Sequence, residues 1–126
     1  GYKVLYANTA KLMSHLKMAK ADGAHLKELS KIEKQDALIL DDFGVQPFDA
    51  GSRALLLDII EDRHGKRSTI ITAQVPVKKW HELIGEKTLA DAILDRIVHQ
   101  SIRIELYGES LRKKQKGNEA LMESYL

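Results

Sequence analysis

Two adjacent carboxylates stand directly after a short apolar run, a pattern that can bind a metal ion. Residues Ala37 to Leu40 contain no polar side chain, and Asp41 and Asp42 follow at once, ahead of Gly44. Such a run predicts a strand buried on both faces of a parallel sheet, and ligands of open α/β sheets bind beyond the carboxyl ends of the strands. One carboxylate could hold Mg²⁺ while the second orients a water molecule. The alternative is that the strand is followed by a polar turn whose two acidic residues bind nothing.

Two polar residues at the end of the next apolar run could complete such a site. Thr72 and Gln74 follow a β-branched segment that predicts a second buried strand. In a doubly wound sheet this strand end lies near Asp41 and Asp42. The neutral amide of Gln74 could position a water molecule or a γ-phosphate, or it could simply cap the strand in solvent.

Two arginines are candidates for contacts with phosphate. Arg96 lies late in an apolar helical segment beside Asp95, so it either forms an ion pair or reaches a phosphate on a neighbouring subunit. Arg112 begins a basic run that is either a solvated tail or a contact to a nucleotide or to DNA. A third basic group ends a predicted helix and comprises Arg63, Lys66 and Arg67. The helix dipole explains that group, and a DNA contact is the less favoured alternative.

The segments that must position these residues alternate between strand and helix patterns. Strands are predicted over 4–7, 37–41, 68–72 and 102–106. Helices are predicted over 9–21, with Thr9 as N-cap, 25–33, from Asp49 or Ser52 to 64, 78–83 and 87–99. This order predicts an α/β fold with a mainly parallel sheet flanked by helices.

Composition narrows the class of protein. The 126 residues are 44% hydrophobic and 30% charged, which indicates one domain with a sizeable core. The chain has no cysteine, which excludes disulfides and thiolate metal sites. Its net charge of only +2 does not by itself indicate nucleic-acid binding. No apolar run approaches the roughly 20 residues of a membrane span, and Gly1 begins no signal peptide. We therefore expect a cytoplasmic protein without a membrane partner. Because the initiator methionine is absent, we also expect a trimmed piece of a longer chain.

Four blocks of sequence, in order, resemble the C-terminal part of an IstB-type AAA+ ATPase, the helper protein of certain bacterial insertion sequences. The blocks are Leu38–Gly44, Ser68–Pro76, Ala92–Arg96 and Gly108–Arg112. DnaC-type helicase loaders are close kin of that family. The resemblance implies a partial AAA+ core of the P-loop NTPase type over 1–116, followed by a tail over 117–126.

The resemblance also implies a role for each candidate residue. Asp41 would be the Walker B magnesium ligand, and Asp42 the catalytic carboxylate, where the wider superfamily usually has the longer glutamate. The other implied residues surround the nucleotide: sensor I Gln74 with Thr72 beside it, the arginine finger Arg96 acting in trans, and the sensor II-like Arg112.

One part of the family pattern is missing from this sequence. The phosphate-binding loop G-x-x-x-x-G-K-[ST] does not occur. We therefore expect this piece alone to bind MgATP weakly and to hydrolyse little of it. In AAA+ sheets the strand that carries this loop lies between the strands predicted here over 68–72 and 102–106. Three outcomes follow: the two strands pair directly, a strand-swapped dimer fills the gap, or the missing part lies outside this sequence.

The function implied is that of an ATP-binding and ATP-hydrolysing regulator of a DNA transposase. The intact protein would use ATP and Mg²⁺, bind duplex DNA and form a homo-oligomer through nucleotide. Two alternatives stay open at this point. One is a helicase-loader-type ATPase switch, and the other is a degenerate, non-enzymatic interaction domain.

Overall fold

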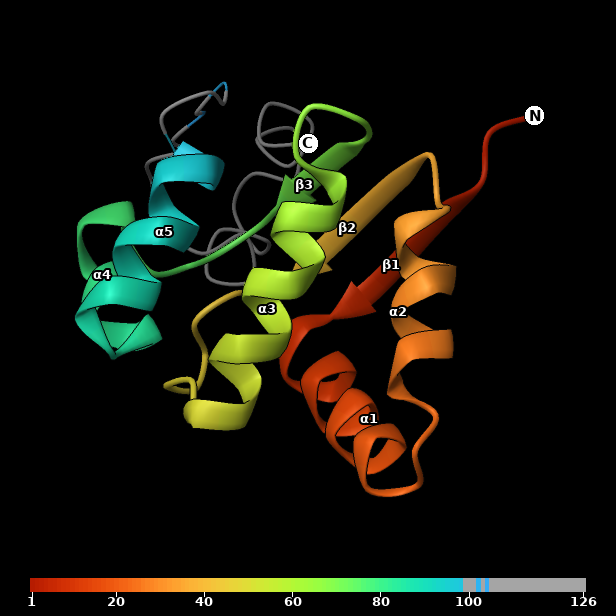
Figure 1. The fold of residues 1–126 in the computed structure, drawn as a ribbon. Coiled ribbons are helices and arrows are strands. Elements are labelled where there is room, and N and C mark those ends of the chain that lie inside the picture. The colour runs from red at the N-terminus through yellow and green to blue at the C-terminus, as the bar shows by residue number, and fades with distance from the viewer. Residues whose placement is uncertain (99–101, 103, 105–126) are drawn as a thin grey trace, which may run out of the picture.

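The computed structural model describes residues 1–98, 102 and 104 (Figure 1). Strands and helices alternate along this part of the chain. In order they are β1 Val4–Asn8, α1 Thr9–Ala21, α2 His25–Glu33, β2 Ala37–Asp41, α3 Ala50–Arg63, β3 Ser68–Ile71, a 3₁₀ turn Val77–Lys79, α4 Trp80–Ile84 and α5 Lys87–Val98. None of the helices in this described part is long and apolar enough to cross a membrane.

The described strands form a three-stranded parallel sheet in the order β1-β2-β3. The register places Tyr6 beside Ile39 and Ile39 beside Ile70, and it pairs Asn8 with Asp41. Helices α1 and α2 connect β1 to β2, and α3 connects β2 to β3. The predicted α/β class with a parallel sheet flanked by helices is therefore confirmed.

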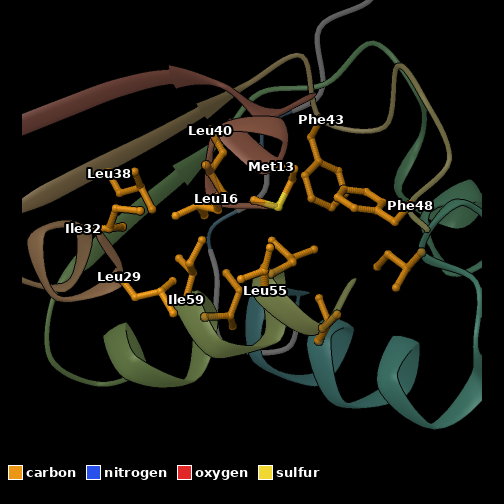
Figure 2. Close-up of a cluster of buried hydrophobic side chains, with 14 of the residues drawn as sticks. Met13, Leu16, Leu29, Ile32, Leu38, Leu40, Phe43, Phe48, Leu55 and Ile59 are labelled. Atoms are coloured by element: carbon orange, nitrogen blue, oxygen red, sulfur yellow. The ribbon is translucent and has the colours of Figure 1, made fainter. Parts of the chain in front are cut away.

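One face of the sheet packs against the helices and forms the core. Leu38 and Leu40 of β2 are fully buried. They point from the sheet toward the helices, and they belong to the same buried cluster as Ile59 of α3 (Figure 2). On the opposite face the described residues leave large apolar side chains open to solvent, with Val4 56% and Ile70 50% exposed. The sheet therefore presents a buried face and an open face.

Arg63, at the end of α3, is a buried structural residue, a role that the helix-dipole interpretation of its basic group did not include. Its side chain is 1% exposed. The guanidinium donates to the carbonyl oxygens of Ile32 at 2.8 Å, Gln35 at 2.8 Å and Ser68 at 2.5 Å, and to Thr69 Oγ1 at 3.0 Å. The side chain is buried because carbonyl groups from the segment that joins the end of α2 to β2 and from the start of β3 converge on it.

The cap of α1 also differs from the prediction. Asn8, not Thr9, is the N-cap, and its Oδ1 accepts a hydrogen bond from the backbone N–H of Lys11 at 3.0 Å. The Thr9 hydroxyl instead donates to the backbone oxygen of Asp41 at 2.8 Å, which ties the start of α1 to the end of β2. The cap of α3 is Asp49, the first of the two predicted residues.

Several predictions concern segments that the structure does not describe or describes only in part. The segment 102–106 is described only at Ile102 and Ile104, which are exposed and outside any strand. Arg112 and the tail 117–126 lie outside the described residues. The sheet gap, the strand-swapped dimer and the division at residue 116 therefore stay predictions.

Candidate functional site

The chain turns sharply at the carboxyl end of β2. Asp42 has a φ of 53°, in the left-handed region, which Asp and Asn tolerate better than most residues. The backbone N–H of Phe43 then donates to the carbonyl of Thr72 at 2.9 Å. The Phe43 ring is fully buried, with its centroid 4.7 Å from that of Trp80 and 5.2 Å from that of Phe48. This aromatic cluster fixes the loop that follows the two carboxylates.

Asp41 holds its carboxylate between the two neighbouring strands. The Thr72 hydroxyl donates to Oδ1, and the Tyr6 hydroxyl donates to Oδ2. These two hydrogen bonds, that from Thr72 first, lower the pKa of Asp41 below its ordinary value. The group is therefore an ionised carboxylate with fixed oxygens, which is the chemistry that a hard cation requires.

Asp42 lies beside Asp41 and faces a small hollow next to α1. Its backbone N–H is 3.4 Å from Thr72 Oγ1. The hollow has a volume of about 80 Å³, and its lining includes Asp42, Thr9, Lys17 and Asp49. Ligand pockets are typically several hundred Å³, so this hollow admits water but not a nucleotide.

Gln74 lies just beyond β3, on the same side of the sheet as the end of β2. Its side chain is exposed, and it makes no hydrogen bond with any residue of the described part. The prediction that Thr72 and Asp41 meet is confirmed by their hydrogen bond. The structure does not bring the exposed amide of Gln74 into a hydrogen bond with either aspartate.

Arg96 is not joined to these residues by any contact that the structure describes. It lies on α5, donates to the carbonyl of Ala92 at 2.9 Å, and pairs with Glu61 of α3 at 3.3 Å. Its side chain is 31% exposed. The ion-pair interpretation of Arg96 is therefore correct for this chain taken alone, with Glu61 as the partner. The predicted action on a neighbouring subunit stays a prediction.

The chemistry that this arrangement allows is that of a single carboxylate, which could hold a cation together with a phosphate-bearing ligand. Within residues 1–98, no group of three or more His, Asp or Glu side chains converges on one point. Mg²⁺ is often held by one or two carboxylates, with waters and substrate phosphates filling its other positions. Asp41 fits that arrangement, and a metal cage built from protein ligands alone does not.

Sequence reasoning missed Tyr6 and Thr9, the residues that hold Asp41 from β1 and α1. Both lie more than thirty positions before Asp41, so no local motif joins them to it. The signal that existed was the pairing of the first two strands. Once β1 and β2 are placed in parallel register, a tyrosine hydroxyl near the end of β1 can reach the end of β2.

The fold class is supported by the sheet and by comparison with solved structures. The DnaC helicase loader covers 75% of this chain with a TM-score of 0.57 at 24% identity, and the match spans 57% of that protein. A DNA replication initiation factor covers 77% with a TM-score of 0.62 at 16% identity, over 30% of its own chain. At these identities the likeness concerns the fold alone. It agrees with the AAA+-type α/β architecture that the sequence predicts.

The family follows from sequence. The profile of the IstB-like ATP binding protein family matches residues 1–119, and the chain belongs to that family. The protein y4pL of Sinorhizobium fredii, named as an insertion sequence ATP-binding protein, is 50% identical over 90% of this chain and 46% of its own. The IS21 ATP-binding protein of Pseudomonas aeruginosa, so described by its name, is 33% identical over 92% of this chain and 44% of its own. The chain thus spans a little under half the length of these relatives.

Proposed function

We propose that the intact protein binds and hydrolyses ATP with Mg²⁺ and in this way regulates a DNA transposase. This chain supplies the carboxylate side of the nucleotide site. The observation that carries the proposal is the Asp41 carboxylate, ionised and held by Thr72 and Tyr6 at the end of a parallel strand. Membership of the IstB-like ATP binding protein family supports the choice of ATP.

In this proposal each residue has a separate task. Asp41 is the Walker B ligand of Mg²⁺, which would neutralise charge on the β- and γ-phosphates. Asp42 orients or deprotonates the attacking water, and Gln74 contacts that water or the γ-phosphate. The side chain of Asp42 is one carbon shorter than that of glutamate, so the left-handed backbone at this residue must help to place its carboxylate.

The phosphates need a partner that this sequence does not contain. The pattern G-x-x-x-x-G-K-[ST] is absent from its 126 residues, and such a loop supplies the backbone N–H cradle and the lysine for the phosphates. We therefore propose that this chain alone holds MgATP weakly and has little ATPase activity. A longer protein that carries such a loop would be the active form.

Oligomer formation and DNA binding belong to the same proposal. Arg96 would leave Glu61 and reach the γ-phosphate of a neighbouring subunit, which its partial exposure at the surface of α5 supports. Arg112 would contact the nucleotide of its own subunit. The assembled ring or filament would then act on duplex DNA together with the transposase.

Nucleotide binding in the full-length gene product tests this proposal. Filter binding of labelled ATP with Mg²⁺ should show binding to the wild type and loss of binding in Asp41→Ala. Asp42→Asn should retain binding and lose hydrolysis, because asparagine tolerates the left-handed backbone but is no base. Absence of ATP binding in the full-length wild type would instead favour a degenerate interaction domain.

A helicase-loader-type switch is the second candidate, since the DnaC helicase loader shares this fold. The two candidates differ in partner and not in the chemistry of Asp41. Affinity capture with the tagged full-length protein in the presence of ATP separates them. Capture of the transposase supports the first candidate, and capture of the replicative helicase supports the second.

A further inference from the structure

The carboxylate of Asp41 is fixed by hydrogen bonds that come from two different strands. Thr72, directly after β3, donates to one oxygen, and Tyr6 of β1 donates to the other. The strand register places Asn8, not Tyr6, opposite Asp41. The Tyr6 side chain must therefore extend along the sheet to reach it. A carboxylate with one donor on each oxygen cannot rotate without breaking a hydrogen bond.

Packing does not explain the position of the Tyr6 ring. Tyr6 is 63% exposed and lies on the open face of the sheet, outside the buried core cluster. A tyrosine this exposed contributes little apolar burial. The polar contact that the structure gives its hydroxyl is the one with Asp41.

We propose that Tyr6 is a positioning residue that holds the Asp41 carboxylate in the orientation that receives Mg²⁺. This inference rests on the proposed function, since it needs Asp41 to be the metal ligand. Each carboxylate oxygen has two lone pairs and accepts one hydrogen bond here, so a cation can bind while Tyr6 stays in place. Outer-shell partners of this kind typically change metal affinity by about 10–100-fold when they are removed.

Binding of Mn²⁺, used as a paramagnetic stand-in for Mg²⁺, tests the role of Tyr6 without any need for ATPase activity. Because a single carboxylate holds a free cation only weakly, the titrations of this 126-residue chain and its variants extend to millimolar Mn²⁺, and electron paramagnetic resonance measures the free ion. Asp41→Asn should abolish the site. Tyr6→Phe, which removes only the hydroxyl, should weaken Mn²⁺ binding by about 10-fold. Tyr2→Phe, in a residue that is 89% exposed and makes no contact with Asp41, is the matched control and should bind as wild type does.

A stability measurement separates positioning from a structural role. The urea midpoint of Tyr6→Phe should lie only slightly below that of Tyr2→Phe, because the one hydrogen bond that Tyr6→Phe removes is exposed to solvent. Wild-type affinity in Tyr6→Phe would overturn the role of Tyr6 and leave that of Asp41 intact. A loss of Mn²⁺ binding that is matched by a loss of folded protein would also overturn it. Equal binding by wild type and Asp41→Asn would overturn the magnesium role of Asp41, and the inference with it.

Discussion

Substitution of Arg63 by methionine should destabilise the fold far more than the same substitution at an exposed arginine. The guanidinium binds the carbonyl groups of Ile32, at the end of α2, Gln35, before β2, and Ser68, in β3. Burial lowers the pKa of Arg63 from its ordinary value, yet arginine stays charged in proteins. One side chain thus joins the end of α3 to the segment that leads from the end of α2 to β2, about thirty residues earlier, and to the start of β3.

The magnitude follows from those three shortest hydrogen bonds. Hydrogen bonds from a charged donor contribute about 1.5–3 kcal/mol each, and a buried carbonyl left without its donor is costly. Taking the low end of this range, and allowing for the desolvation that the guanidinium no longer pays, we expect Arg63→Met to lower the free energy of unfolding by about 3 kcal/mol. Methionine keeps the apolar stem, so the change reports on the polar head.

Urea unfolding followed by the fluorescence of Trp80, the single tryptophan, measures this loss. Arg67→Met is the matched control, because Arg67 forms a partly exposed ion pair with Asp36 at 3.1 Å and should cost less than about 1 kcal/mol. Arg63→Lys should also be destabilised, since one ammonium cannot reproduce the planar fork. If Arg63→Met and Arg67→Met lose the same stability, the bridging role of Arg63 is refuted.

Substitutions at three further positions test the packing and the charges near the site. Phe43→Ala removes a fully buried ring and should cost about 3–5 kcal/mol in the same urea assay, and a cost below about 1 kcal/mol would contradict the packing. The ion pair with Lys17 is the first cause that lowers the pKa of Asp49, so its stabilisation is present above the unfolded pKa near ~4 and is lost as the pH falls. As the pH is lowered from about 7 to about 3, the urea midpoint should therefore fall more for wild type than for Asp49→Asn. Asparagine keeps the helix cap but removes the charge. An equal fall in both proteins would contradict the role of the ion pair. Thr72→Val should weaken Mn²⁺ binding at Asp41 while Thr72→Ser retains it, and equal affinities in both would show that the Thr72 hydroxyl does not act on the metal site.

The strands and the acidic strand end could be predicted because their signals are local. Continuous apolar and β-branched runs defined β2 and β3 to within a residue. The position of Asp41 after such a run predicted a cation site from the sequence alone. The α3 cap at Asp49 was also predictable, because a capping side chain acts on the backbone three residues later.

The remaining features depend on contacts between distant segments. Nothing near Arg63 shows that carbonyl groups from α2 and β3 converge on it, so the sequence pattern indicated only an interaction with the helix dipole. Asn8 and Thr9 are both good N-caps, and only the hydrogen bond of Thr9 to the end of β2 decides between them. Glu61, the partner of Arg96, lies on another helix and thirty-five positions earlier in the chain.

The most direct test of the account is to locate the residues at which a divalent cation binds on this chain. The opposite end of the sheet also holds carboxylates, Glu33 and Asp36, beside an open hollow of about 600 Å³. In a ¹⁵N NMR titration with Mn²⁺, we expect the amide signals of Asp41 and Thr72 to broaden first, and Asp41→Asn to remove that broadening. Broadening centred on Glu33 and Asp36, or unchanged in Asp41→Asn, would contradict the assignment of Asp41 as the magnesium ligand.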